Sequence, residues 1–137
     1  MLEVSAGAVV YTRINKEIKY VIIHDNNGNY GFPKGHVENN ETIQETAIRE
    51  IKEECGVNIE LFDSFKKEIY YTLPNGNNKQ AIYFLGRYFD QELIPQKGEI
   101  QRIFLLSYKE AHELINFPDV KNILESANNY IHSLKDY

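Results

Sequence analysis

Three glutamates, Glu50, Glu53 and Glu54, stand at positions i, i+3 and i+4 of a segment that we expect to be helical from about Thr42 to Cys55. Residues at this spacing share one helix face, so their carboxylates repel one another at roughly a few tenths of a kcal/mol per pair. A divalent cation would remove this conflict. Oxygen ligands of this kind suit Mg²⁺ or Mn²⁺, whose coordination is usually completed by water and substrate phosphates.

An acidic run is more often a solvated helix surface, because charged side chains prefer water. Here the flanking residues decide between the two interpretations. Gly35 is followed after five residues by Glu41 and after seven more by Arg49-Glu50-Ile51-Lys52-Glu53-Glu54-Cys55-Gly56-Val57. The segment matches the Nudix box, Gly-x5-Glu-x7-Arg-Glu-U-x-Glu-Glu-x-Gly-U with U an aliphatic residue, at every position. The chain therefore resembles the Nudix hydrolases.

This resemblance implies an α+β fold, an α/β/α sandwich with a mixed sheet between helices, and cleavage of a nucleoside diphosphate linked to a further group. It also implies a metal site formed by Glu50, Glu53 and Glu54 with the backbone carbonyl of Gly35. In the same family Arg49 and Glu41 would hold the carboxylates in place through charge-assisted hydrogen bonds.

Length and composition fit an enzyme of this kind. At 137 residues we expect one domain, residues 1–137, with a real core. The single cysteine excludes an internal disulfide, and Cys55 falls on the apolar face of the expected helix, where packing is its more common role. The first eleven residues lack a basic region and a spanning apolar stretch, so we expect a cytoplasmic protein without a membrane anchor. A net charge of -5 argues against unspecific nucleic-acid binding.

Hydrophobic patterns predict the elements that must position the box. Two strands are expected near 4–11 and 19–24, a hairpin from 59–73 and 79–89, and a further strand at 99–106. Ser107 and Glu110 form a capping-box pattern that opens a short helix to about Ile115. A last helix is expected from Pro118, with Val120, Ile123, Leu124, Ala127, Ile131 and Leu134 as its apolar stripe.

Residues before and after the box narrow the resemblance. The run Gly31-Phe32-Pro33-Lys34-Gly35-His36-Val37-Glu38 has a form found in Nudix enzymes that act on polyphosphate-rich substrates. Lys34 and His36 would place cationic or hydrogen-bonding groups beside the metal site. With Tyr71, Lys79 and the segment 82–85, the chain is similar over nearly its whole length to the asymmetrical diadenosine tetraphosphate hydrolases.

That similarity implies roles for four more residues. Lys79 and Tyr83 would contact the polyphosphate, while Tyr71 and Phe117 would flank an adenine by stacking, worth roughly 1–3 kcal/mol per base. The alternative for Tyr71 and Tyr83 is ordinary core packing, since both lie in alternating strands. Lys79 would otherwise be a surface charge.

Glu99 is a separate candidate, far from the acidic helix in sequence. The family places a glutamate near this position that completes the metal cluster or acts as base. The match is loose, because the family often has histidine beside this glutamate and this chain has Gly98 and Ile100. The sequence leaves the base open between Glu54 and Glu99.

Three functions remain open from the sequence. The first is hydrolysis of diadenosine tetraphosphate to ATP and AMP by a metal-activated water. The second is a pyrophosphohydrolase acting on the 5′-triphosphate end of RNA, which shares the Phe-Pro-Lys-Gly form but would be expected to carry a more basic surface. The third is a nucleotide-binding regulator without catalysis, which would carry substitutions in the glutamate cluster. The oligomeric state is left undetermined.

Overall fold

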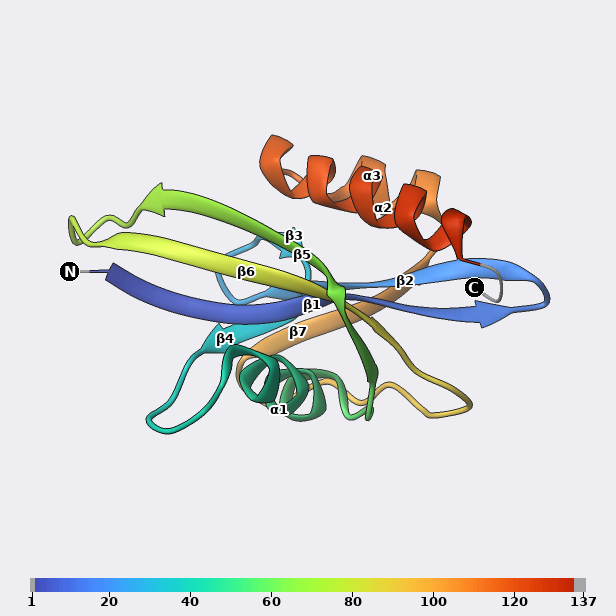
Figure 1. The fold of residues 1–137 in the computed structure, drawn as a ribbon, viewed down its shortest axis with the longest axis horizontal. Helices are drawn as coiled ribbons and strands as arrows, with labels where there is room; N and C mark the ends of the chain where they lie inside the picture. Colours follow the sequence, from blue (N-terminus) through green and yellow to red (C-terminus); the bar gives the residue numbers. More distant parts are fainter. Residues whose placement is uncertain (1, 135–137) are drawn as a thin grey trace.

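The computed structural model describes residues 2–134, apart from the side chain of Gln101. In this part of the chain, seven strands form one mixed sheet accompanied by three helices (Figure 1). The strands are β1 Leu2–Ile14, β2 Glu17–Asp25, β3 Tyr30–Gly31, β4 Lys34–His36, β5 Glu60–Thr72, β6 Asn78–Arg87 and β7 Ile100–Leu106. The helices are α1 Ile43–Cys55, α2 Tyr108–Leu114 and α3 Pro118–Ser133.

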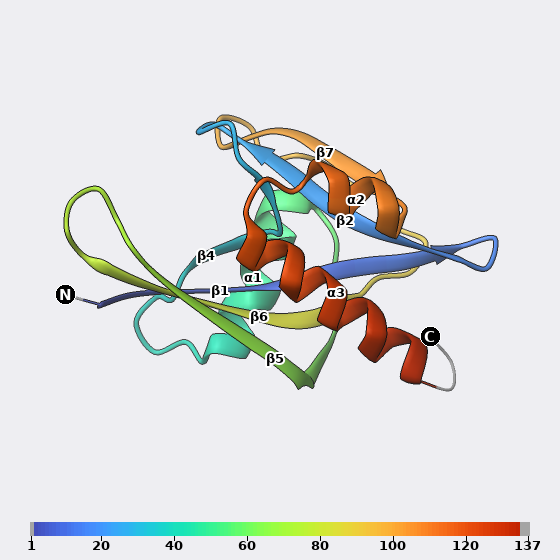
Figure 2. The same ribbon diagram turned by 90° about the horizontal axis from the view of Figure 1, so that it is seen from above.

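The sheet is covered on both faces. Helix α1 lies against one face, and α2 and α3 lie against the other (Figures 1 and 2). On the α1 side, Ala47, Ile51 and Cys55 pack into one buried cluster with strand residues. On the other side, the α3 stripe packs into a second cluster, in which Val120, Ile123, Leu124, Ala127 and Ile131 are buried. The expected α/β/α sandwich of the α+β class is confirmed.

Strand β1 is the centre of the sheet and mixes its directions. It pairs in parallel with β6 and antiparallel with β2 and β4. Its stretch 5–12 is buried throughout, as expected of a strand covered on both faces. The short β4 pairs with residues 5–7 of β1, and this pairing carries Lys34 to His36 alongside α1. The sequence patterns did not predict the short strands β3 and β4.

Local sequence explains both ends of α1. Thr42 accepts a hydrogen bond from the backbone N–H of Glu45, and the Glu45 carboxylate accepts one from the N–H of Thr42. This capping box satisfies backbone donors that a helix N-terminus leaves unpaired. At the other end Gly56 adopts φ 79°, a left-handed conformation that is cheap only for glycine. The predicted start and end of the box helix are therefore confirmed.

The other expected elements are also present. The hairpin predicted from 59–73 and 79–89 is β5 and β6, paired antiparallel with a register shift between Phe62 and Lys67. Ser107 caps α2 through the predicted capping box, and Pro118 opens α3. Strand β7 begins at Ile100, so Glu99 lies in the turn just before it. Within residues 2–134, no helix has the length and apolar character needed to cross a membrane.

Gly56→Ala tests whether the left-handed end of α1 fixes the box helix. An added Cβ would meet the Ile94 Cβ at 3.0 Å and would require a φ of 79°. We expect the free energy of unfolding to fall by about 1–2 kcal/mol in urea denaturation. Gly28→Ala is the matched control: its φ of 81° is similar but an added Cβ meets no atom within 4 Å, so it should show only the cost of the left-handed backbone and a smaller loss than Gly56→Ala. Equal stability of Gly56→Ala and the unmodified protein would contradict the assignment.

Candidate active site

Arg49 organises the acidic residues around the box helix. Its Nε donates to Glu41 Oε2 at 2.6 Å and its Nη2 to Glu41 Oε1 at 3.0 Å, a bidentate pair. Its Nη1 donates to Glu50 Oε1 at 2.9 Å, and its Nη2 also donates to the carbonyl oxygen of His36 at 3.1 Å. Arg49 thus connects α1, the loop before it and the end of β4.

Glu41 is held as a carboxylate by these contacts. Besides the Arg49 guanidinium, the hydroxyl of Thr46 and the backbone N–H of Glu38 donate to Glu41 Oε1. The guanidinium is the main cause that lowers the pKa of Glu41 to about 2, and the Glu38 and Thr46 hydrogen bonds add to it. In return, Glu41 raises the pKa of Arg49. The expected structural partnership of Arg49 and Glu41 is present in the structure.

Glu50 and Glu54 form a close carboxyl pair one helical turn apart. Glu54 is only 4 % exposed, and burial is the main cause that raises its pKa to about 9, with its hydrogen bond to Glu50 and the charge of Glu50 adding to the rise. The backbone N–H of Lys34 and the charge of its side chain act in the opposite direction. Burial and the neighbouring Glu50 carboxylate thus both favour the protonated form of Glu54 in the absence of a cation.

Gly35, which has no side chain, leaves the space that the Glu50 carboxyl group occupies. A Cβ on Gly35 would lie 2.0 Å from the Glu50 Cδ and 2.1 Å from its Oε2. Only a glycine allows the β4 backbone to approach this carboxylate so closely. The requirement for glycine at the first position of the box is therefore steric in this structure.

The third glutamate of the box points elsewhere. Glu53 is 45 % exposed in its side chain and accepts from Arg49 Nη1 at 3.2 and 3.3 Å. Among the described residues, no three acidic, histidine or cysteine side chains converge as a ready ligand set. The pair of Glu50 and Glu54, with the Gly35 backbone against it, nevertheless has the hard oxygen donors that suit a divalent cation.

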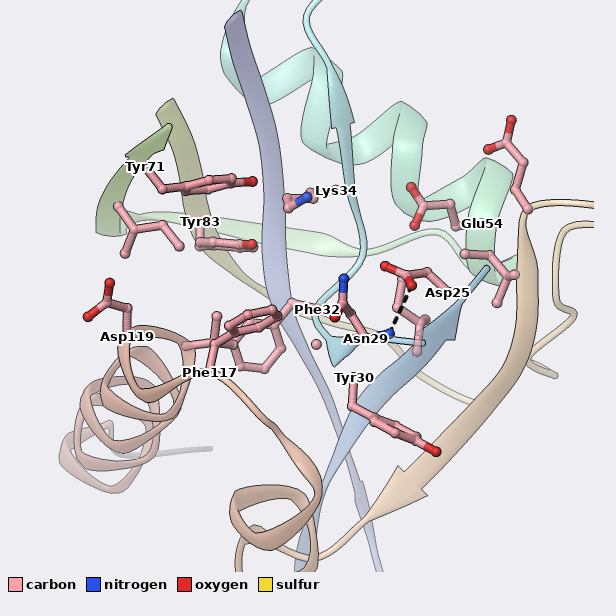
Figure 3. Close-up of a pocket in the computed structure, with 16 residues that line it drawn as sticks. Asp25, Asn29, Tyr30, Phe32, Lys34, Glu54, Tyr71, Tyr83, Phe117 and Asp119 are labelled. Atoms are coloured by element: carbon pink, nitrogen blue, oxygen red, sulfur yellow. Dashed lines mark hydrogen bonds between the residues drawn. The ribbon is translucent and has the colours of Figure 1, made fainter. Parts of the chain in front are cut away.

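A cavity of about 430 Å³ opens beside this pair (Figure 3). Lys34 from β4, Glu54 from α1 and Glu99 from the turn before β7 line it, so these predicted residues are brought together. In Figure 3, Lys34 and Glu54 project into the cavity from the side of β4 and α1. The cavity therefore has a polar end that carries both signs of charge.

The opposite end of the cavity is aromatic. Tyr71, Tyr83 and Phe117 line it together with Phe32, and Tyr71 and Phe117 are 40 % and 47 % exposed. Tyr83 is almost fully buried and packs edge-on against Phe32, with ring centroids 5.6 Å apart. Tyr83 thus belongs to the core and to the cavity wall at once. The exposed rings of Tyr71 and Phe117 are the two that could stack on a planar ligand.

Lys79 and His36 form a separate cluster that does not line this cavity. Lys79 Nζ lies 3.0 Å from His36 Nε2, which is in turn 3.4 Å from Glu3 Oε1. Lys79 is only 5 % exposed, and burial lowers its pKa, with the nearby Lys34 charge adding to the effect. The alternative interpretation of Lys79 as a surface charge is wrong. The parallel pairing of β1 with β6 places Lys79 opposite Glu3, where it is buried. Its contact with polyphosphate remains a prediction.

Several cavity residues were missed by sequence reasoning. The last residue of β2, Asp25, lines the cavity, as do Asn29 from the loop that follows and Asp119 from α3. Asp25 Oδ1 accepts from the backbone N–H groups of Asn27 and Asn29, which closes this loop locally. Asn26 donates to the carbonyl oxygen of Gly98, so the loop also contacts the turn that carries Glu99. The sequence signal for Asp119 was its place directly after Phe117 and Pro118.

Comparison with known proteins gives the family. The NUDIX domain model matches residues 1–126. A bis(5′-nucleosyl)-tetraphosphatase [asymmetrical] of Sus scrofa is 30% identical over 126 residues, which cover 88% of this chain and 85% of that protein. An RNA pyrophosphohydrolase of Nitratiruptor is 26% identical and covers 88% of both chains.

Solved structures agree on the fold. A binary complex of the C. elegans Ap4A hydrolase superposes with a TM-score of 0.90 at 20% identity, covering 96% of this chain and 99% of that one. The NUDIX domain of Shewanella oneidensis NrtR, complexed with ADP ribose, gives a TM-score of 0.78 at 16% identity and covers 96% and 89%. With the complete box, the sandwich fold and the family match in agreement, the chain belongs to the NUDIX hydrolases.

Proposed function

We propose that this Nudix pyrophosphohydrolase cleaves a P–O–P bond of dinucleoside tetraphosphates, converting diadenosine tetraphosphate to ATP and AMP, and that residues 1–137 form its single domain. The observation that carries the proposal is the two-ended cavity. One end has Lys34 and Glu54, with Glu50 paired to Glu54, which suit phosphate and metal, and the other has exposed aromatic rings for a base. The names of the pig and nematode relatives support the same substrate class.

The residues present fit a divalent cation, for which we propose Mg²⁺, with Mn²⁺ as an alternative. The ion would be held by the carboxylates of Glu50, Glu53, Glu54 and Glu99 and by the backbone carbonyl of Gly35. When bound, such an ion lowers the pKa of the attacking water and offsets charge on the leaving phosphate. Both oxygens of Glu53 accept from Arg49 Nη1, and their remaining lone pairs would be the ones that bind the ion.

The side chains of this chain supply positioning and proton transfer. Lys34 lines the cavity and would neutralise phosphate oxygens next to the carboxylates, and Lys79 and His36, which contact each other outside the cavity lining, would bind the further phosphates. Of the cavity-lining carboxylates near that end, Glu54 or Glu99 would accept the proton of the attacking water. Positioning the phosphates in line with the attacking water would lower the activation free energy by roughly several kcal/mol.

A second candidate is an RNA 5′-triphosphate pyrophosphohydrolase, favoured by the Nitratiruptor relative. An RNA strand requires a basic surface for its phosphates. This chain has 15 basic against 20 acidic residues, which favours a small nucleotide instead. A regulator without catalysis is disfavoured by the intact glutamate cluster.

Hydrolysis of diadenosine tetraphosphate with Mg²⁺ in ¹⁸O-labelled water tests the proposal. We expect equal amounts of ATP and AMP, with the label on one of them, when the products are weighed by mass spectrometry. The label also identifies the phosphorus that water attacks. Two molecules of ADP, no cleavage, or faster release of pyrophosphate from triphosphorylated RNA would reject this substrate and leave the family membership unchanged.

Glu54→Gln is expected to lower kcat by a hundredfold or more, because the amide removes one charged oxygen donor from the proposed metal site. The measurement is steady-state hydrolysis of diadenosine tetraphosphate. Glu113→Gln on the exposed side of α2 is the matched control and should retain full activity. Near-normal turnover by a folded Glu54→Gln protein would contradict the site assignment.

The raised pKa of Glu54 predicts how the metal-free protein responds to pH. The folded carboxyl has a pKa of about 9, above the ordinary value of 4.5, so between these values the folded state binds more protons than the unfolded state. Stability must therefore fall as pH rises through this window, by at most about 1.4 kcal/mol per pH unit for one group. In EDTA, we expect Glu54→Gln to be less pH-sensitive and more stable than the unmodified protein at pH 8.

Urea denaturation at pH 5.5 and 8 measures this effect. Excess Mg²⁺ should reduce the difference between the two proteins at pH 8, because bound metal stabilises the folded state of the unmodified chain. Parallel pH dependence of both proteins in EDTA would mean that Glu54 titrates normally.

A further inference from the structure

Asp119 is the one charged group at the aromatic end of the cavity among the lining residues that the structure describes. It lies in the first turn of α3, next to Phe117, and its side chain is exposed. The other charged lining residues come from β2, β4, α1 and the turn before β7. In Figure 3, Asp119 lies beside Phe117, with Tyr83 between it and Lys34.

This arrangement orients a nucleotide along the cavity. Phosphates belong at the end with Lys34 and Glu54, because that end has the cation and the proposed metal ligands. A base that stacks on Tyr71 or Phe117 then lies at the opposite end. Its ribose would be directed toward the phosphates, so its outer hydrogen-bonding edge would face the side of the cavity where Asp119 lies beside Phe117 (Figure 3).

A carboxylate at that edge discriminates between bases. An ionised aspartate only accepts hydrogen bonds. Guanine offers two adjacent donors on its outer edge, N1–H and the 2-amino group, which match the two carboxylate oxygens. Adenine offers one donor, the 6-amino group, beside the acceptor N1, whose lone pair faces the carboxylate unfavourably. Stacking alone makes no such distinction, because every base has a π face.

We propose that Asp119 is a specificity-determining residue that selects guanine over adenine for the base held at the aromatic end. This inference rests on the proposed function, and it makes guanine-containing dinucleoside tetraphosphates the better substrates. Because Asp119 is exposed and competes with water, the preference is moderate, at about fivefold or more in kcat/KM. Stacking on the aromatic residues keeps adenine nucleotides as substrates.

The test compares diguanosine tetraphosphate with diadenosine tetraphosphate in the unmodified protein and in Asp119→Asn. Asparagine has the same shape but carries one donor and one acceptor, which match the adenine edge. We expect the guanine-to-adenine ratio of kcat/KM to fall by about fivefold or more in Asp119→Asn. Asp63→Asn, an exposed aspartate on β5 outside the cavity, should leave the ratio unchanged.

Two results would overturn the inference. One is an unmodified protein that cleaves both substrates equally or prefers adenine. The other is an unchanged guanine-to-adenine ratio in Asp119→Asn. If the melting temperature of this variant is also lower, Asp119 acts only as a favourable charge at the N-terminus of α3.

If the proposed function fails, the base preference can still be tested by nucleotide binding. If neither tetraphosphate is cleaved, binding of GTP and ATP in EDTA, followed by tyrosine fluorescence, still measures the base preference of the same variants. A guanine preference that Asp119→Asn removes would keep the inference for another nucleotide substrate. Equal binding of GTP and ATP by the unmodified protein would reject it.

Discussion

The candidate site depends on the hydrogen bonds that the Arg49 guanidinium donates. A lysine could supply the same charge but not the five donors in one plane, with which Arg49 reaches Glu41, Glu50, Glu53 and the His36 carbonyl. These contacts join the N-terminal loop of α1, the middle of the helix and the end of β4. The carboxylates are therefore placed by a network that exists before any ligand binds, in the way outer contacts orient metal ligands in other sites.

The same site works against the stability of the fold. A buried carboxyl pair on one helix face is unfavourable unless a proton or a cation is shared, and Glu54 is almost fully buried. The rest of α1 offsets this cost. Both ends are capped, and Ala47, Ile51 and Cys55 are fully buried against the sheet, at about 1.5–3 kcal/mol for a side chain such as isoleucine. Local strain at a functional site is thus supported by ordinary packing around it.

Sequence reasoning succeeded where the determining forces are local. The start of α1 follows from Thr42 and Glu45, its end from Gly56, and its buried face from a four-residue spacing. The pairing of β4 with β1 could not be predicted, because a three-residue strand has no periodicity of its own. The burial of Lys79 depends on the parallel register of β6 with β1, which places Glu3 beside it. Asp119 joins the cavity only because α3 packs across the sheet, which is a non-local event.

We infer that the planar set of donors of the Arg49 guanidinium, and not its charge alone, orients Glu50 for the proposed metal site. Titration of Mn²⁺ by electron paramagnetic resonance, with the unmodified protein and Arg49→Lys, tests it most directly. The substitution keeps the charge but loses the bidentate contact with Glu41. We predict Mn²⁺ affinity weakened by about tenfold or more in a variant that remains folded. Unchanged Mn²⁺ affinity in folded Arg49→Lys would contradict the account.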